Sequence, residues 1–149
     1  MELVVLVGLQ GSGKSTFYRE RFAATHALVS KDLMRSARHK GERQRRQIEE
    51  ALSAGTSVVV DNTNVRREDR AALLALARAF GARTVGYYFV PDVKASLARN
   101  RAREGKARVP DVAIHAAARR LEPPSRSEGF DALHEVRVRE GGGFEVGEP

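Results

Sequence analysis

Residues 8–16 read Gly8-Leu9-Gln10-Gly11-Ser12-Gly13-Lys14-Ser15-Thr16. They fit the pattern G-x-x-x-x-G-K-[S/T], which is typical of a loop that binds nucleotide phosphates. The flanking sequence agrees with this interpretation. Residues 3–7 form an apolar run, as in a buried parallel strand, and the chain from Ser15 onward reads as a helix. The stretch therefore predicts a strand, a phosphate loop (residues 8–16) and a helix.

The glycines of the phosphate loop allow its backbone to wrap around an anion. We expect positive φ at Gly8, Gly11 and Gly13, so that several N–H groups point into one concavity at the helix N-terminus. Lys14 would reach the β- and γ-phosphates, and the Ser15 hydroxyl would ligate Mg²⁺. An ordinary glycine-rich turn would not need Lys-Ser directly after the third glycine. The sequence thus predicts bound ATP, or another NTP, and Mg²⁺. The predicted nucleotide-binding residues are Gly8, Gly11, Ser12, Gly13, Lys14, Ser15 and Thr16.

Length and composition limit the other possibilities. The 149 residues suit a single domain, 1–149, and leave no room for a large separate substrate domain. Lys and Arg number 26 against 19 Asp and Glu, a net charge of +7, which favours a polyanionic partner, although basic surfaces also serve solubility. Without cysteines the chain has neither disulfides nor thiolate metal sites. No membrane span or leader is expected, which predicts a cytoplasmic protein.

Apolar runs and helical periodicities alternate along the chain. We expect further strands at 27–29, 57–60 and 84–90, and helices up to about 54, at 66–80, at 93–103 and from 110. Gly41 would divide the basic region 31–54 into two helices. A C-terminal hairpin is expected within 132–147. This order predicts an α/β fold, a P-loop NTPase-type three-layer sandwich with a mostly parallel central sheet.

Two acidic positions follow predicted strands and should lie beside the phosphate loop, because such sheets bind ligands at the carboxyl ends of their strands. Asp32 and Arg35 share one face of a predicted helix, although an i,i+3 ion pair alone would explain them. Asp61 ends an apolar strand and resembles the second acidic motif of phosphate-loop proteins, which supports Mg²⁺. The polar stretch 61–64 could equally form a turn or a cap.

Two basic regions are candidates for binding anions. The stretch from Lys31 to Arg46 carries seven Lys and Arg against two acids, either as a path for a phosphate backbone or as a solvated helix face. Arg99 and Arg103 lie four residues apart beside a polar loop. We expect a lid around residues 99–110 whose arginines close over a triphosphate, although a solvated basic helix is the simpler alternative.

Taken in order, these motifs resemble the kinase domain of the 5′-hydroxyl polynucleotide kinases. The resemblance spans roughly residues 3–136. It rests on the phosphate loop, D-x-x-R at 32–35, D-N-T-N at 61–64, R-N-x-x-R at 99–103 with Val-Pro at 109–110, and E-P-P at 122–124 with E-G-F at 128–130. The phosphate loop is shared by many NTPases, whereas the combined order of the other motifs is far more specific.

The resemblance implies a role for each matching residue. Asp32 would accept the proton of the attacking 5′-hydroxyl, and Arg35 would bind the phosphate next to the acceptor nucleoside. Lys14, Arg99 and Arg103 would hold the donor phosphates. Asp61, Asn62 and Thr63 would shape the acceptor site. The implied substrate is a 5′-hydroxyl end of DNA or RNA, in nucleic-acid repair. No partner protein is evident, so 3′-end processing or sealing would require another chain.

Two other functions are compatible with the same residues. A P-loop kinase acting on a small-molecule metabolite or nucleotide-sugar could use Asp32 in the same way, but the charge of +7 favours a longer anion. A nucleotide-dependent binding module without turnover would not need Asp32 and Arg35.

Overall fold

The computed structural model of the chain describes residues 1–34 and 38–149. These residues form a six-stranded sheet with the order β2-β3-β1-β4-β5-β6. The strands are β1 (Glu2–Val7), β2 (Ala27–Val29), β3 (Val58–Asp61), β4 (Arg83–Phe89), β5 (Ala132–Val138) and β6 (Phe144–Gly147). All neighbouring pairs are parallel except β5 and β6, which pair antiparallel. The predicted α/β fold with a mostly parallel sheet is confirmed.

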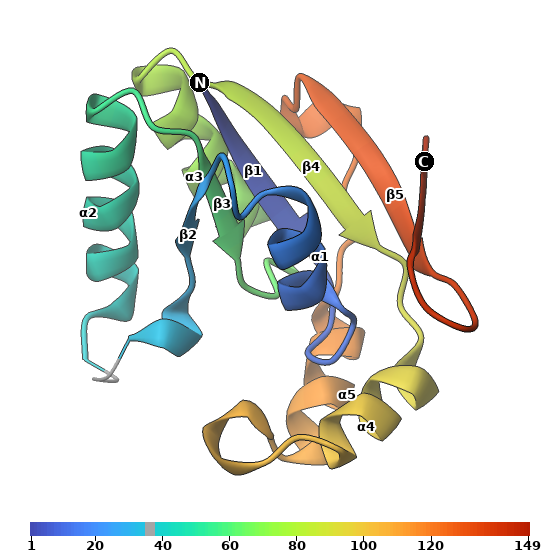
Figure 1. Cartoon of the computed structure of the whole chain (residues 1–149). Helices are drawn as coiled ribbons and strands as arrows, with labels where there is room; N and C mark the ends of the chain where they lie inside the picture. The colour runs from blue at the N-terminus through green and yellow to red at the C-terminus, as the bar shows by residue number, and fades with distance from the viewer. Residues whose placement is uncertain (35–37) are drawn as a thin grey trace.

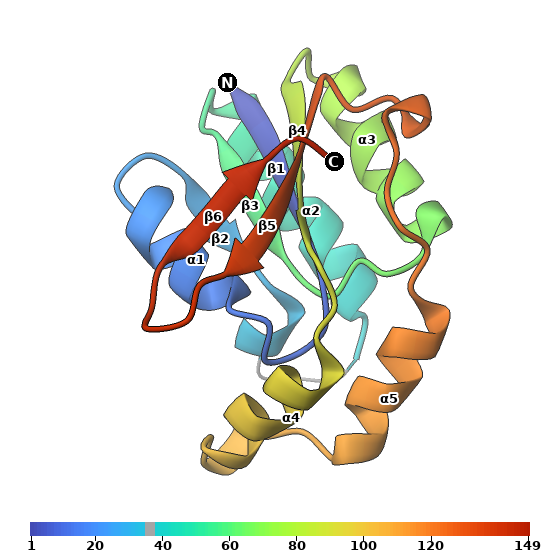
Figure 2. The same cartoon turned by 90° about the vertical axis from the view of Figure 1, so that its right-hand side faces the viewer.

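Helices cover both faces of this sheet, which makes three layers. The α-helices are α1 (Lys14–Arg21), α2 (Lys40–Ser53), α3 (Arg67–Ala79), α4 (Val93–Arg101) and α5 (Asp111–Arg120). Short 3₁₀ turns occur at η1 (Lys31–Leu33), η2 (Gly105–Ala107) and η3 (Arg126–Glu128). Helix α1 lies on one face, and α2 and α3 lie on the other (Figure 1, Figure 2). Helices α4 and α5 extend below the carboxyl ends of the strands.

The central strand β1 is buried on both faces. Leu3, Val5 and Val7 join the core under α2 and α3, while Val4 and Leu6 join the core under α1. All five are fully buried, and burying each such side chain stabilises the fold by about 1.5–3 kcal/mol. The phosphate loop therefore leaves a strand that is packed on both faces.

Three local predictions differ from the structure. The helix expected at 93–103 ends at Arg101, so Arg103 lies beyond it. Gly41 does not interrupt a helix, because α2 begins at Lys40 and includes it. Asp32 lies in the three-residue turn η1 and not in an α-helix, since Met34 already has extended backbone and a buried side chain. Arg35 lies outside the described residues.

Aromatic packing attaches the last strand to helix α1. The Phe144 ring of β6 lies 5.1 Å from the Phe17 ring, centroid to centroid, and also packs against Phe89.

Among the described residues no helix is both long and apolar enough to span a membrane.

Candidate active site

Glycines shape the phosphate loop for two different reasons. Gly11 and Gly13 have φ of +74° and +97°, as predicted. The positive φ expected at Gly8 is wrong. Gly8 is instead required by close packing, because a Cβ there would lie 2.8 Å from Cβ of Phe89. Gly13 also lies under the last strand, since its Cβ would be 3.1 Å from the Phe144 ring. The loop is thus fixed by strands β4 and β6 as well as by its own sequence.

Helix α4 packs directly on the phosphate loop. A Cβ on Gly11 would lie 2.6 Å from the backbone oxygen of Ser96, so only glycine fits. Arg99 Nη1 donates to the Gly11 carbonyl oxygen across 2.9 Å. In this structure Arg99 therefore stabilises the loop backbone.

Lys14 is a buried cation within the phosphate loop. Its side chain is bonded through Nζ to the carbonyl oxygens of Gly8 at 3.0 Å and Leu9 at 2.8 Å. Burial lowers its pKa from 10.5 to about 8, the Asp61 carboxylate opposes this shift, and the Arg103 guanidinium adds to it. Because carbonyl dipoles only partly compensate a buried charge, the site favours an anion beside Lys14.

Ser15 and Asp61 bring two oxygen ligands together. Ser15 Oγ, in the first turn of α1, donates to Asp61 Oδ2 at the end of β3 across 2.9 Å. Hydroxyl and carboxylate oxygens are ligands that suit Mg²⁺, which usually keeps several waters and binds substrate phosphates. Among the described residues no group of three or more His, Cys, Asp or Glu side chains is placed to hold a metal ion. A magnesium ion bound here would take its other ligands from phosphates and water.

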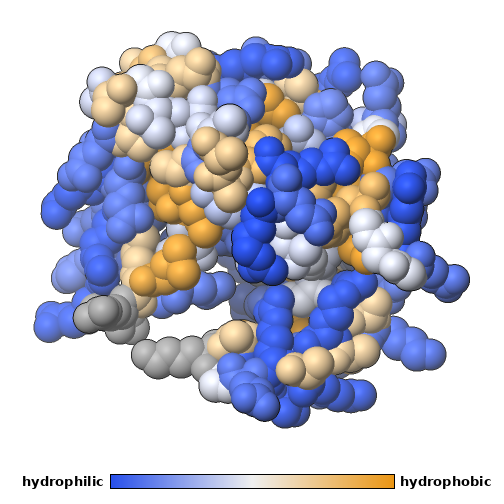
Figure 3. All heavy atoms as spheres, in the orientation of Figure 1, coloured by the Kyte–Doolittle hydropathy of each residue, from blue (hydrophilic) through white to orange (hydrophobic). Residues whose placement is uncertain are grey.

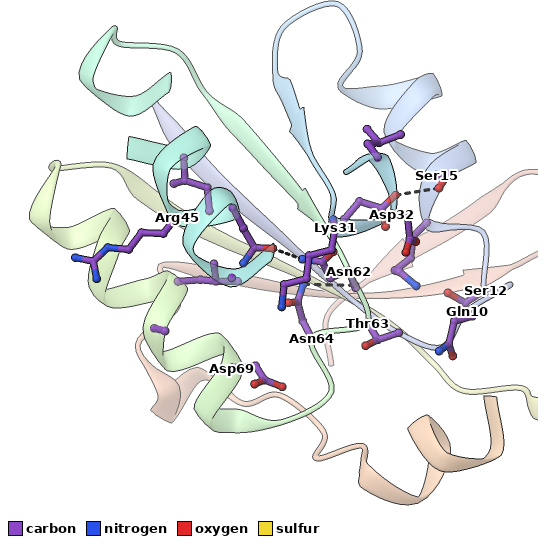
Figure 4. A pocket seen from close by; sticks show the side chains of 18 of the residues that line it. Gln10, Ser12, Ser15, Lys31, Asp32, Arg45, Asn62, Thr63, Asn64 and Asp69 are labelled. Atoms are coloured by element: carbon purple, nitrogen blue, oxygen red, sulfur yellow. Dashed lines mark hydrogen bonds between the residues drawn. The ribbon is translucent and has the colours of Figure 1, made fainter. Parts of the chain in front are cut away.

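A large cavity of about 1390 Å³ extends from the phosphate loop between helices α2 and α3. Asp32 lines it together with Lys14, Ser15 and Asp61, and Arg103 lines it from the segment between α4 and α5. Asp32 and Ser15 are both labelled in Figure 4, where the dashed line from Ser15 marks its hydrogen bond to Asp61. Hydrophilic side chains cover α2 and the α4–α5 segment on the face shown in Figure 3.

Asn62 connects three elements at the edge of the cavity. Its Oδ1 accepts from the Lys31 backbone N–H at 3.0 Å, and its Nδ2 donates to Gln44 Oε1 of helix α2. Turn η1 is also capped by Ser30, whose hydroxyl accepts from the Asp32 backbone N–H. Asn62 therefore holds the turn that carries Asp32, with its contacts drawn as dashed lines in Figure 4.

Asn100 fixes the segment between α4 and α5 at its base. This fully buried side chain donates to the Val109 carbonyl oxygen at 2.7 Å and accepts from the Val109 N–H at 2.9 Å. The two bonds close residues 101–108 into a loop. Arg103 belongs to this loop and donates to the Ala107 carbonyl oxygen across 3.4 Å.

A buried ion pair, which the sequence analysis missed, supports the turn after β3. Arg70 is fully buried and binds Glu128 through two bonds of 2.8 and 3.0 Å. Arg70 Nη1 also donates to the carbonyl oxygens of Asn64 and Val65. The same turn carries Thr63, whose carbonyl oxygen accepts from the Gly8 N–H at 3.0 Å. The ion pair thus stabilises the turn to which the phosphate loop is hydrogen-bonded.

We expect Glu128→Gln to lower the free energy of unfolding by about 3–5 kcal/mol, because it leaves the Arg70 charge buried without its counter-ion. The double variant Arg70→Met/Glu128→Gln should recover part of this loss. Denaturant unfolding of both single variants and the double variant gives the coupling energy. Purely additive losses would contradict a coupled pair.

The sequence profile of the AAA domain family matches residues 3–124. The chain belongs to this family. The chain is also 29% identical, over 139 residues, to the bifunctional polynucleotide phosphatase/kinase of Schizosaccharomyces pombe. The match covers 91% of this chain and 33% of that relative, so the chain spans about a third of the relative's length.

Solved structures of P-loop kinases share the fold of this chain. A fungal RNA kinase superposes with a TM-score of 0.69 at 14% identity, covering 91% of this chain and 38% of that one. A gluconokinase from Sinorhizobium meliloti 1021 superposes with a TM-score of 0.63 at 21% identity, covering 91% and 82%. The fold is that of a nucleotide-binding P-loop kinase. The names of the two neighbours, RNA kinase and gluconokinase, refer to different acceptors.

The cavity gathers most of the residues that the sequence analysis selected. Its lining includes Gly11, Ser12, Lys14, Ser15, Thr16, Asp32, Asp61, Asn62, Thr63 and Arg103. Gly8, Gly13 and Arg99 are not among the described lining residues, and they act on the loop backbone instead. Sequence reasoning missed Arg70, although a charged residue three positions before Leu73 on an apolar helix face was a signal.

Proposed function

We propose that this protein transfers the γ-phosphoryl group of ATP, or of another NTP, to the 5′-hydroxyl end of DNA or RNA, in the cytoplasm and in nucleic-acid repair. The observation that carries the proposal is the position of Asp32. Its carboxylate lines the same cavity as Lys14 and the Ser15–Asp61 pair, on a turn that Asn62 holds in place. The match to a polynucleotide phosphatase/kinase supports the same reaction.

The residues present fit the requirements of phosphoryl transfer. Lys14 and the loop N–H groups would bind the donor phosphates, and Arg103 would stabilise charge on the transferred group. Ser15 and Asp61 would hold magnesium, which neutralises the negative charge of the triphosphate when it is bound. Asp32 takes the proton of the 5′-hydroxyl while the oxygen of that hydroxyl bonds to the γ-phosphorus. The bond from that phosphorus to the β–γ bridging oxygen breaks, and ADP leaves.

The acceptor would enter from the side of helices α2 and α3. The cavity continues past Asp32 between these helices. Together with the net charge of +7, this favours a polynucleotide end over a small acceptor. Arg35, which would bind the phosphate next to the acceptor nucleoside, remains a prediction from the resemblance.

One observation favours a different acceptor. Glu68 and Asp69, in the first turn of α3, are exposed and line the acceptor end of the cavity. Carboxylates accept hydrogen bonds from hydroxyl groups and repel phosphodiesters, which suits a neutral polyol. A small-molecule kinase, like the gluconokinase with the same fold, is therefore the second candidate function.

An acceptor competition separates these functions. With γ-labelled ATP and Mg²⁺, we expect label on 5′-hydroxyl DNA or RNA oligonucleotides and none on the same oligonucleotides carrying a 5′-phosphate. Nucleosides, gluconate and other sugars serve as competing acceptors in the same reaction. Label on a sugar alone would assign a metabolite kinase. ATP binding without any transfer would indicate a binding module.

A further inference from the structure

We propose that Gln44 of helix α2 is a positioning residue that acts on the proposed base, Asp32, through Asn62. The Asn62 side chain follows β3 and accepts from the Lys31 backbone N–H through Oδ1 at 3.0 Å. Its Nδ2 donates to Gln44 Oε1. All four residues line the cavity, and Lys31, Asp32 and Asn62 are labelled in Figure 4. Two hydrogen bonds in series thus connect helix α2 to the turn that carries Asp32.

The Lys31 backbone N–H determines the orientation of both carboxamides. An N–H group can only donate, so the Asn62 atom that faces it is the oxygen. The Asn62 nitrogen then faces Gln44, and Gln44 presents its own oxygen to it. Both side chains are half-buried, and leaving such an amide without a partner is unfavourable. Gln44 therefore keeps Asn62 from rotating its oxygen away from turn η1.

The bond from Lys31 to Asn62 sets where turn η1 lies. Among the described residues, the other hydrogen bonds of this turn join residues 30–34 to one another, so they fix its shape. The buried Met34 side chain holds the end of the turn, and Asn62 holds its beginning. Releasing the beginning of the turn would displace the Asp32 carboxylate, and a shift of about 1 Å is enough to slow a reaction that depends on alignment.

The first experiment measures whether Gln44 affects turnover without affecting binding. The inference rests on the proposed transfer reaction with Asp32 as its base, and it holds for any hydroxyl acceptor. Gln44→Met keeps the side-chain length but removes the acceptor atom, and we expect kcat to fall about tenfold. The acceptor KM and the Kd of the β,γ-imido analogue of ATP should each change by less than about twofold, because the printed partner of Gln44 is Asn62 and not the phosphate loop.

Two variants of helix α2 serve as controls for Gln44→Met. Gln44→Glu keeps an oxygen that can accept from Asn62 Nδ2, so it should retain kcat within about threefold. Gln47→Met makes the same chemical change at an exposed position of α2 and should leave turnover unchanged. If Gln44→Met does not fold, Gln44→Ala gives the same comparison.

Two further measurements distinguish positioning of Asp32 from direct contact with the acceptor. In the Asn62→Leu background, Gln44→Met should lower kcat no further, because the connection to Asp32 is already broken. In the ¹H–¹⁵N spectrum of the nucleotide-free protein, the Lys31 N–H proton should shift upfield in Gln44→Met as its hydrogen bond weakens, and it should not move in Gln47→Met.

The outcomes separate this inference from the proposed function. Additive losses from Gln44→Met and Asn62→Leu, or a higher acceptor KM at unchanged kcat, would overturn it and assign Gln44 to acceptor binding. Equal losses of nucleotide affinity and turnover would overturn it in favour of a role in stability alone. An unchanged Lys31 shift in Gln44→Met would overturn it for any acceptor. If the wild type transfers phosphate to no acceptor, the proposed function fails, and the Lys31 shift still decides whether Gln44 holds the turn.

Discussion

Replacing Asp32 by asparagine is expected to lower kcat for phosphoryl transfer by about a hundredfold or more, with little change in nucleotide affinity. Asparagine has nearly the same size but cannot accept the proton of the attacking hydroxyl. Among the described residues no hydrogen bond joins Asp32 to the phosphate loop, and the charge of Asp32 contributes least among the causes that set the pKa of Lys14. Its backbone N–H is bonded to Ser30, and its turn is held by Asn62, and both contacts remain in the variant. Steady-state transfer to a 5′-hydroxyl oligonucleotide and calorimetry with the β,γ-imido analogue measure the two quantities.

The control for this experiment is Glu50→Gln, which removes one exposed carboxylate from helix α2 outside the cavity. It makes the same change in net charge and should leave turnover unchanged. Wild-type turnover in Asp32→Asn would show that no base is needed at this position. A loss of imido-ATP binding would show instead that Asp32 acts on the donor side.

Replacing Lys14 by methionine is expected to abolish nucleotide binding while making the nucleotide-free protein more stable. Keeping the buried ammonium charged costs about 3 kcal/mol, from the lowering of its pKa from 10.5 to about 8. The bonds from Nζ to Gly8 and Leu9, worth about 1 kcal/mol each, offset part of this cost. We therefore expect the free energy of unfolding at pH 7 to rise by about 1 kcal/mol.

Thermal and denaturant unfolding with and without nucleotide test both halves of the Lys14 prediction. At a nucleotide concentration 100 times Kd, wild type should gain about 2.7 kcal/mol, and Lys14→Met should gain none. Lys94→Met, at an exposed position of α4, controls for the loss of one positive charge. Wild-type nucleotide affinity in Lys14→Met would contradict the assigned role.

The same pKa predicts how stability and binding depend on pH. Below about pH 8, Lys14 is protonated in both the folded and unfolded states, and the folded state bears the full cost. Between about pH 8 and 10.5 only the unfolded state keeps the proton, so stability rises with pH by this contribution. Lys14→Met should lack that rise. Nucleotide binding favours the cation, so Kd should increase as the pH passes 8 in the wild type.

The fold class followed from local sequence patterns. The apolar run at residues 3–7, the glycines at 11 and 13 and the Lys-Ser pair act through backbone preferences and short spacings. The structure has the predicted strand, loop and helix at these positions. The periodicity of later segments predicted most of the remaining strands and helices with small errors at their ends, but the helix predicted around Asp32 is the short turn η1. Helix ends depend on neighbours in space as well as on propensity, as the early end of α4 at Arg101 shows.

The arrangement of the candidate site was decided by contacts between distant parts of the chain. Arg99 reaches Gly11 across 88 residues, and Arg70 reaches Glu128 across 58 residues. Phe144 packs on Gly13 because strand β6 returns beside helix α1. The sequence alone determined that a phosphate loop opens an α/β fold, because that pattern is local. Only the tertiary structure decided which arginine faces the cavity, since this depends on where the chain returns.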